Sequence, residues 1–250
     1  MTLPGVRVAY DASASDWLSG PVQVYSRLAE ALVRRSPVPL AGSSVLDVGA
    51  GTGVAGRVAR AAGARRVVAA DVAVEMLRLG DRSSTPVVAD ARALPFADSS
   101  FDLIVAACSL SHVPDPVRAL REMKRVAPTV LISAFRSGWT HPAKAVVDDV
   151  LAQFGYRVPA WYLALKREVE PAVDDVTSLT RLVTDAGYRE PMLDVVEVTT
   201  GLRTPAQLAE WRMGMAHLAP FVAGLAPETR AAALVDPPPL VISLVVLAAG

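Results

Sequence analysis

A glycine-rich turn with an acidic residue beside it is the first feature of this sequence that could do chemistry. The stretch SSVLDVGAGTGVAG, residues 43–56, places Asp47 just before Gly49, and Gly51 and Gly53 follow. Glycine has no Cβ and tolerates positive φ, so such a turn lets a ligand approach the backbone closely. An apolar run leads into Gly49 and a predicted helix begins near Val54, where free N–H groups are available. The stretch therefore predicts a ligand site between a buried strand and a helix.

Two further acids follow the next predicted strands. Asp71 closes the second strand and Asp90 closes the third. With Asp47 they supply three carboxylates at or near the carboxyl ends of successive strands, where open α/β sheets bind ligands. Each acid alone is equally compatible with a helix cap or a solvated loop. The three in order, at neighbouring strand ends, indicate one shared ligand site rather than three unrelated caps.

The elements that must position these residues alternate regularly along the chain. Short runs rich in valine and isoleucine alternate with segments of helical length, which is typical of a parallel sheet covered on both faces. The predicted strands are residues 45–48, 66–71, 87–90, 101–107, 129–134, 192–199 and 240–248. The predicted helices between them include 54–62, 73–79, one that starts at Pro116 and ends before Pro128, and one near 174–186.

Two segments are longer than the connections of such a sheet require. Residues 136–190 contain two extra amphipathic pieces, about 142–154 and 160–166, and residues 204–226 begin with Thr204, a suitable helix N-cap. Insertions at strand ends usually shape a substrate site. No repeat or linker marks a second domain, so we expect one domain over residues 1–250 in which these two segments form a substrate cap.

Composition limits the classes of partner. The chain has 250 residues, with 25 basic and 25 acidic side chains, so no overall positive charge attracts nucleic acid. The single cysteine, Cys108, excludes an intramolecular disulfide and gives no zinc-ligand spacing, which favours a reducing cytoplasm. The N-terminus lacks the pattern of a signal peptide. The apolar C-terminus has only about a dozen apolar residues, whereas a membrane-spanning helix needs roughly 20, so we expect no membrane partner.

A dinucleotide site is the first alternative for the glycine turn. Gly51, Gly53 and Gly56 match the spacing G-x-G-x-x-G, and Asp71 lies about 20 residues further on, which would suit a nicotinamide-dependent oxidoreductase. That pattern, however, places its first glycine directly after the strand, and here this residue is Gly49. Asp47 would also repel a pyrophosphate, whereas it would attract a cationic ligand.

The sequence VLDVGAGTG resembles the first motif of the class I S-adenosylmethionine-dependent methyltransferases. The runs LPFADSSFDLIV and HVPDPVRALREMKRV resemble the branch that includes ubiquinone- and menaquinone-pathway enzymes and many small-molecule tailoring enzymes. The resemblance covers about residues 43–134. It implies a doubly wound, Rossmann-like α/β fold with a seven-stranded sheet, mostly parallel with an antiparallel last strand, and S-adenosyl-L-methionine as the cofactor.

The resemblance also implies roles for individual residues. Asp71, with Val72 next to it, would bind the ribose hydroxyls, and Asp90 would lie beside the adenine amino group, where Ala91 could donate its backbone N–H. Cys108, after the fourth strand, would contact the methionine portion through its main chain. Residues 1–35 would form lid helices, in which Tyr10 and Trp17 shield the cofactor; a plain amphipathic helix is the alternative. The cofactor-binding set is therefore Tyr10, Asp47, Gly49, Gly51, Gly53, Asp71, Val72, Asp90, Ala91 and Cys108.

The acceptor side is less specific in the sequence. Methyl transfer needs a base only when the acceptor atom must lose a proton, and histidine is the usual choice. His141, after the fifth strand, is our preferred candidate, His112, after the fourth, is the second, and the alternative for each is a side chain that only bonds to backbone. Four aromatic residues of the insertions could line an acceptor pocket or simply pack there: Trp139, Trp161, Tyr162 and Trp211.

We therefore predict methyl transfer from S-adenosyl-L-methionine to a small-molecule acceptor. The second alternative is a protein that binds S-adenosylmethionine without methylating, since the binding motifs do not depend on the acceptor. The motifs specify neither the acceptor atom nor the oligomeric state.

Overall fold

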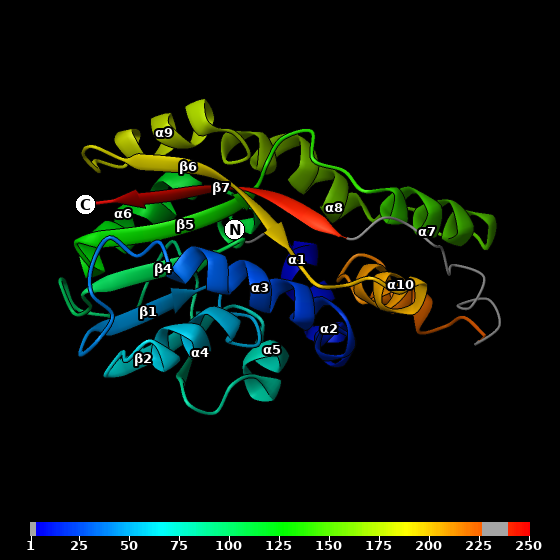
Figure 1. Ribbon diagram of the computed structural model, residues 1–250, viewed down its shortest axis with the longest axis horizontal. Helices are drawn as coiled ribbons and strands as arrows, with labels where there is room; N and C mark the ends of the chain where they lie inside the picture. The colour runs from blue at the N-terminus through cyan, green and yellow to red at the C-terminus, as the bar shows by residue number, and fades with distance from the viewer. Residues whose placement is uncertain (1–3, 227–239) are drawn as a thin grey trace.

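A seven-stranded sheet of order β3-β2-β1-β4-β5-β7-β6 forms the centre of the computed structural model, which describes residues 4–226 and 240–250. Strand β7 pairs antiparallel with both of its neighbours, and the other pairings are parallel. The predicted fold class is therefore confirmed (Figure 1). The strands are β1 (Ser44–Val48), β2 (Arg66–Asp71), β3 (Thr85–Val88), β4 (Leu103–Ala107), β5 (Thr129–Phe135), β6 (Met192–Thr199) and β7 (Val241–Ala249).

Strand β3 lies two residues earlier in the chain than predicted. It is an edge strand, and within the described part of the chain it pairs only with β2, so Pro86, which has no N–H to donate, is tolerated within it. Asp90 does not continue the strand because its carboxylate accepts the backbone N–H of Arg92 at 2.9 Å and closes a tight turn. The acid predicted at the strand end thus lies two residues beyond it.

Helices cover both faces of the sheet because alternate strand residues point to opposite sides. On one face, Val45 and Leu103 pack with α3 (Pro21–Val33) and α4 (Val54–Ala61). On the other, Leu46 and Ile104 pack with α6 (Pro116–Val126) and α9 (Val176–Asp185). Figure 1 shows α3 and α4 in front of the strands and α6 and α9 on the far side.

The N-terminal helices, for which a lid is expected, pack against different parts of the molecule. Helices α1 (Pro4–Ala12) and α2 (Ala14–Ser19) pack beside α5 (Val74–Leu79), where Trp17 is buried against Ala73 and Met76. Helix α3 belongs instead to the core, since Leu28 and Leu32 are fully buried in it. Helices α1 and α2 thus lie beside α5, whereas α3 packs in the core; residues 1–3 of the expected lid lie outside the described part.

The two insertions lie beyond the carboxyl ends of the parallel strands. The first contains α7 (Pro142–Gln153), α8 (Ala160–Ala164), a π-helical turn η2 (Leu165–Val169) and a 3-10 turn η3 (Glu170–Ala172). The second contains α10 (Pro205–Met213) and α11 (Ala219–Val222), and α10 packs on both α7 and α3. Thr204 caps α10 as predicted, and Gln207 completes a capping box. In Figure 1, α7 and α10 extend past the end of the sheet.

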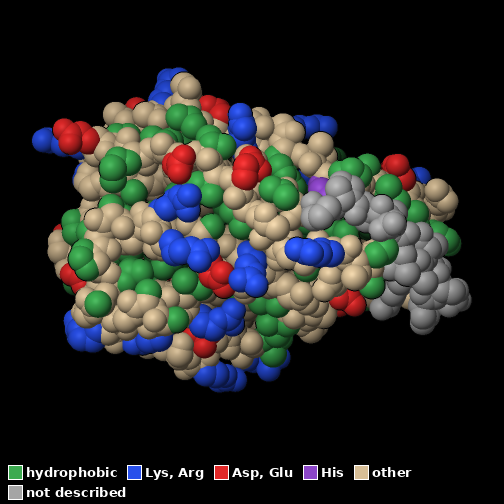
Figure 2. All heavy atoms as spheres, viewed as in Figure 1, with side chains coloured by type: hydrophobic (Ala, Val, Ile, Leu, Met, Phe, Trp, Pro, Cys, Tyr) green, Lys and Arg blue, Asp and Glu red, His purple; other side chains and the backbone are tan. Residues whose placement is uncertain are grey.

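The surface carries both signs of charge. Figure 2 shows Lys and Arg side chains over the face that α3 and α4 cover, with Asp and Glu side chains and apolar atoms between them. This distribution agrees with the equal numbers of basic and acidic residues. Within residues 4–226 and 240–250, no helix combines the length and the apolar character that crossing a bilayer would need.

Candidate functional site

One cavity at the carboxyl ends of β1, β2 and β4 brings the predicted cofactor residues together. Nine of the ten line it: Tyr10, Asp47, Gly49, Gly51, Asp71, Val72, Asp90, Ala91 and Cys108. The tenth, Gly53, is the N-cap of α4 and does not line the cavity. Residues from the first, second and fourth strands therefore meet at one place, as expected for a ligand site in an open α/β sheet.

The glycine turn depends on glycine at three positions. Gly49, Gly51 and Gly53 have φ of +68°, +55° and +78°, in the region that L-residues rarely adopt. A Cβ on Gly51 would meet no atom within 4 Å and would project into open space, whereas a Cβ on Gly49 would lie 2.3 Å from Cβ of Ser109. The turn thus leaves room for a ligand at Gly51 and packs tightly against the loop after β4 at Gly49.

Gly49→Ala should destabilise the fold. The left-handed backbone alone costs about 1–2 kcal/mol for alanine, and the contact with Ser109 forces the loop after β4 to move. We expect a lower midpoint in urea unfolding. Gly42→Ala is the matched control, because Gly42 has φ +78° but no atom within 4 Å of its added Cβ. Equal losses of stability in the two variants would contradict the packing argument.

Asp47 carries a buried oxygen without a partner. Its Oδ2 accepts the backbone N–H of Gly56 at 2.8 Å, but its Oδ1 has no hydrogen-bond partner among the described residues. The side chain is 1% exposed, and this burial raises the pKa of Asp47 to about 7. Because a buried charge is stabilised by an opposite charge, the free oxygen fits a cationic ligand in the cavity.

Asp71 fixes the shape of the turn. Its Oδ2 accepts the N–H of Gly51 at 2.7 Å, and its Oδ1 accepts the N–H of Ala73 at 2.8 Å. Burial raises the pKa of Asp71, and these backbone hydrogen bonds oppose the rise. Each carboxylate oxygen can accept a second hydrogen bond, so the side chain can still receive two hydroxyl groups from a ligand.

Asp90 has a partner that the sequence analysis missed. Arg92 donates from Nε to Oδ1 at 3.0 Å and from Nη2 to Oδ2 at 2.6 Å. This bidentate pair holds the pKa of Asp90 below its usual value and fixes the carboxylate at the cavity edge next to Ala91. The spacing Asp-x-Arg after a strand was the available signal.

Cys108 adopts an unusual backbone at the end of β4. Its φ is +53°, and its N–H donates to the carbonyl of Ser133 at 3.0 Å. Burial raises the pKa of the Cys108 thiol to about 11, so the side chain remains a neutral thiol near pH 7. The next residue, Ser109, donates its hydroxyl to the carbonyl of Val48 at 2.7 Å, which ties this loop to the glycine turn.

The two candidate histidines occupy different environments. His112, in the 3-10 turn η1 (Leu110–His112), lines the cavity, and its Nε2 lies 3.0 Å from the hydroxyl of Tyr10. Burial and Lys166 lower the pKa of His112 to about 4, so its imidazole is neutral near pH 7. His141 instead caps α7, where its Nδ1 accepts the N–H of Ala143 at 3.3 Å.

Of the two candidate histidines, the structure places His112 at the first cavity and His141 at the start of α7. His141 lines neither the first cavity nor the second one described next. The reason is local: α7 begins at Pro142, and the N-cap position turns the imidazole back toward the helix N-terminus.

A second cavity adjoins the first and is lined by the insertions. The four aromatic residues predicted for an acceptor pocket all line it, namely Trp139, Trp161, Tyr162 and Trp211. Tyr10, Tyr25 and His112 line both cavities, so these three residues form the boundary between them. The sequence analysis did not foresee the charged residues of the second cavity: Arg136, Lys144, Lys166, Arg212, Glu170 and Asp174.

Comparison with known proteins identifies relatives for this arrangement. A family model described as a methyltransferase domain matches residues 46–128. The demethylmenaquinone methyltransferase of Renibacterium salmoninarum is 30% identical over 194 residues, which cover 72% of this chain and 79% of the relative. The enzyme of the same name from Mycobacterium sp. (strain JLS) is 48% identical over 86 residues, but these cover only 34% of this chain and 37% of that relative.

Solved structures with low sequence identity share the fold. A putative methyltransferase from an antibiotic biosynthesis pathway of Anabaena variabilis has a TM-score of 0.62 at 15% identity, covering 91% of this chain and 99% of that one. The [4+2]-cyclase SpnF has a TM-score of 0.57 at 23% identity, with coverage of 90% and 80%. A Haemonchus contortus phosphoethanolamine N-methyltransferase in complex with S-adenosyl-L-methionine has a TM-score of 0.57 at 17% identity, with coverage of 88% and 51%.

Proposed function

The chain belongs to the class I S-adenosylmethionine-dependent methyltransferases, and we propose that its first cavity holds the cofactor while its second holds the methyl acceptor. The reaction of the family is transfer of a methyl group from S-adenosylmethionine to a small molecule. One observation carries the proposal for the site: the two cavities share Tyr10, Tyr25 and His112. A donor in one and an acceptor in the other would meet at these three residues.

The donors and acceptors of the first cavity fit the cofactor group by group. The unpaired Oδ1 of Asp47 suits the positively charged methionine end. The carboxylate of Asp71 suits the ribose diol, and Asp90 with the backbone of Ala91 suits the adenine edge. The open space at Gly51 admits a ligand against the backbone. When bound, the cofactor supplies a methyl group that its sulfonium has already activated.

The chain itself has to orient the acceptor and exclude water. Tyr10 and Trp17 from α1 and α2 line the first cavity, with ring centroids 5.7 Å apart, and Trp17 lies 4.6 Å from Tyr25. Tyr10 and Tyr25 also line the second cavity, so this aromatic cluster reaches the boundary between the two. We propose that α1 and α2 act as the lid over the bound cofactor.

We propose a flat, largely aromatic acceptor for the second cavity. Trp139, Trp161, Tyr162 and Trp211 offer ring surfaces that such a molecule can stack against. The relatives named as demethylmenaquinone methyltransferases support an acceptor of this kind.

Labelled methyl transfer tests the proposal. We expect label from methyl-labelled S-adenosylmethionine to appear in hydroxylated aromatic acceptors, with demethylmenaquinone among those tried, when products are separated by mass spectrometry. Titration should show binding of S-adenosylhomocysteine and none of NAD(P). Binding of S-adenosylhomocysteine without label transfer to any acceptor would instead favour a non-methylating role, and binding of NAD(P) alone would contradict the cofactor assignment.

We propose that His112 takes the proton from an acceptor hydroxyl during transfer. Its imidazole lies at the boundary of the two cavities, and its Nε2 is already 3.0 Å from a hydroxyl, that of Tyr10. His112→Gln should lower kcat by about 100-fold or more, the usual contribution of a positioned base, while the affinity for S-adenosylhomocysteine stays near that of the wild type.

His141→Gln is the matched control, because it removes a buried histidine that lines neither cavity. It should cost about 1 kcal/mol of stability through the weakened N-cap, with little change in kcat. If His112→Gln has a normal kcat, His112 is not the base. If only His141→Gln shows a large loss of kcat, His141 is the base, as the sequence analysis preferred.

A further inference from the structure

Some charged side chains of the second cavity have an ion-pair partner and others do not. Arg212 is held by Asp148 through two hydrogen bonds of 2.9 and 2.6 Å, and Lys166 is held by Glu170 at 2.6 Å. Lys144 also lines this cavity, yet no carboxylate lies within 4.0 Å of its ammonium among the described residues. The remaining acid of the lining, Asp174, forms no ion pair within that part of the chain either.

The charged form of Lys144 is disfavoured in this position. Its ammonium lies 5.0 Å from the ring centroid of Trp139, and the residue is half-buried. Burial, Arg212 and Lys166 lower the pKa of Lys144 to about 8, while Asp148 and Glu170 act in the opposite direction. An anion bound beside this ammonium would stabilise its charged form.

Two buried side chains of the same cavity also lack partners. The indole Nε1 of Trp211 and the Nε2 of His217 have no hydrogen-bond partner among the described residues, and the two side chains are 3% and 5% exposed. An indole N–H can only donate, so Trp211 calls for an acceptor atom. The Trp211 ring lies 6.4 Å from Trp139, the ring over which Lys144 is placed.

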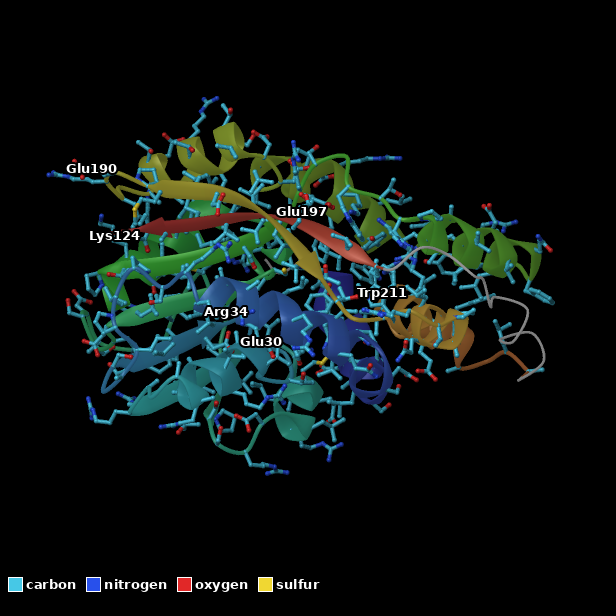
Figure 3. All side chains as sticks on the ribbon, in the orientation of Figure 1. Glu30, Arg34, Lys124, Glu190, Glu197 and Trp211 are labelled. Carbon is cyan, nitrogen blue, oxygen red and sulfur yellow. The ribbon has the colours of Figure 1, made fainter. Side chains whose placement is uncertain are left out.

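These side chains lie close enough together to bind one ligand. Lys144, Trp139 and Trp211 form a contiguous cluster that combines a cation, an aromatic wall and an unpaired N–H donor. His217, stacked on Tyr162 at 3.9 Å, contributes a second unpaired nitrogen next to a flat ring surface. Trp211 is labelled in Figure 3, on α10 at the end of the sheet where the insertions lie.

Building on the proposed function, we propose that the methyl acceptor is an aromatic carboxylic acid whose carboxylate binds the ammonium of Lys144 and the indole N–H of Trp211. The ring system of the acceptor lies among the aromatic side chains of the cavity, and the carboxylate fixes which ring position faces the cofactor. Lys144 and Trp211 are thus specificity-determining residues for an acidic acceptor.

Paired titrations on the protein loaded with S-adenosylhomocysteine test this inference. Each aromatic acid is compared with its uncharged amide, for example 1-hydroxy-2-naphthoate with 1-hydroxy-2-naphthamide and salicylate with salicylamide. The acids should bind about 10-fold or more tightly than their amides, since a hydrogen bond to a charged partner is much stronger than a neutral one. Lys144→Met should abolish the preference and Lys144→Arg should retain most of it.

Lys124→Met is the matched control. Lys124 is also a lysine placed over an aromatic ring, 4.7 Å from the centroid of Tyr188, but Figure 3 shows it at the opposite end of the sheet from Trp211. This variant should keep the wild-type preference for acids. If no acid of the series binds more tightly than its amide, or if Lys144→Met leaves the preference unchanged, the inference is overturned.

The same experiment separates this inference from the proposed function. Each variant is first titrated with S-adenosylhomocysteine, which reports on folding and on the first cavity alone. If the wild type does not bind S-adenosylhomocysteine, the cofactor assignment is contradicted. Normal binding of S-adenosylhomocysteine with equal affinity for acids and amides would count against acid recognition only.

Discussion

Replacement of Asp71 by alanine is expected to weaken binding of S-adenosylhomocysteine by about 10- to 150-fold, which corresponds to the roughly 1.5–3 kcal/mol of hydrogen bonds to a charged group. The carboxylate is expected to bind the ribose hydroxyls, and it also accepts the N–H groups of Gly51 and Ala73 at 2.7 and 2.8 Å. The variant therefore loses contacts with the ligand and the support of the turn that surrounds it. Isothermal titration calorimetry measures the affinity directly.

Asp81→Ala supplies the control for this experiment. Asp81 also lies close to the glycine turn, 3.2 Å from a Cβ built on Gly53, but its carboxylate binds Ser83 and Ser84 and it does not line the first cavity. Its removal should leave the affinity within about twofold, as for other surface substitutions. If a folded Asp71→Ala protein binds S-adenosylhomocysteine as tightly as the wild type, the ribose assignment is wrong.

The clustering of residues around the first cavity could be predicted from the sequence because its parts are local. Each acid follows its own apolar run, and the glycines follow the first strand directly, so strand order alone brings Asp47, Asp71 and the turn to one edge of the sheet. The shift of β3 did not affect this prediction. Asp90 lies two residues beyond the end of β3 and not at it, but it still lines the cavity because Arg92 fixes its carboxylate there.

The second cavity could be predicted only in part, because its walls come from separate insertions. The ammonium of Lys144 on α7 meets Trp139 in the preceding loop, and Trp211 on α10 completes the cluster. No spacing in the sequence links these positions, since their contact depends on the packing of α10 against α7. His112 and His141 follow strands in similar ways, but His141 is the N-cap of α7, whereas His112 lies in η1 and contacts Tyr10.

Asp47→Asn should make the apoprotein more stable above pH 7. Burial raises the pKa of Asp47 from 3.8 to about 7 in the folded chain. Between these values the folded chain binds more protons than the unfolded chain, so the stability of the wild type falls as the pH rises from about 4 to about 7. At about 1.4 kcal/mol for each pKa unit, the loss is slightly more than about 4 kcal/mol. Asparagine does not ionise and should not show this fall.

Urea unfolding of the apoprotein at pH 5 and at pH 8 measures the effect. The difference in unfolding free energy between Asp47→Asn and the wild type should increase from pH 5 to pH 8 in favour of the variant. Asp102→Asn is a control of opposite sign, because Asp102 accepts the N–H and the hydroxyl of Ser44, which hold its pKa below the usual value. Asp102→Asn should therefore lose stability at pH 8.

The same Asp47→Asn variant should bind S-adenosylmethionine less tightly, because its amide offers no charge to the cationic end of the ligand. In the wild type, bound cofactor favours the ionised carboxylate, so affinity should rise as the pH passes through about 7, whereas the variant should show no such rise. Together, the two expected results would show that the carboxylate of Asp47 destabilises the empty protein and strengthens the complex, as expected of a residue that serves binding rather than folding. A variant with higher stability and undiminished affinity at pH 8 would show that the unpaired oxygen of Asp47 has no part in binding the cofactor.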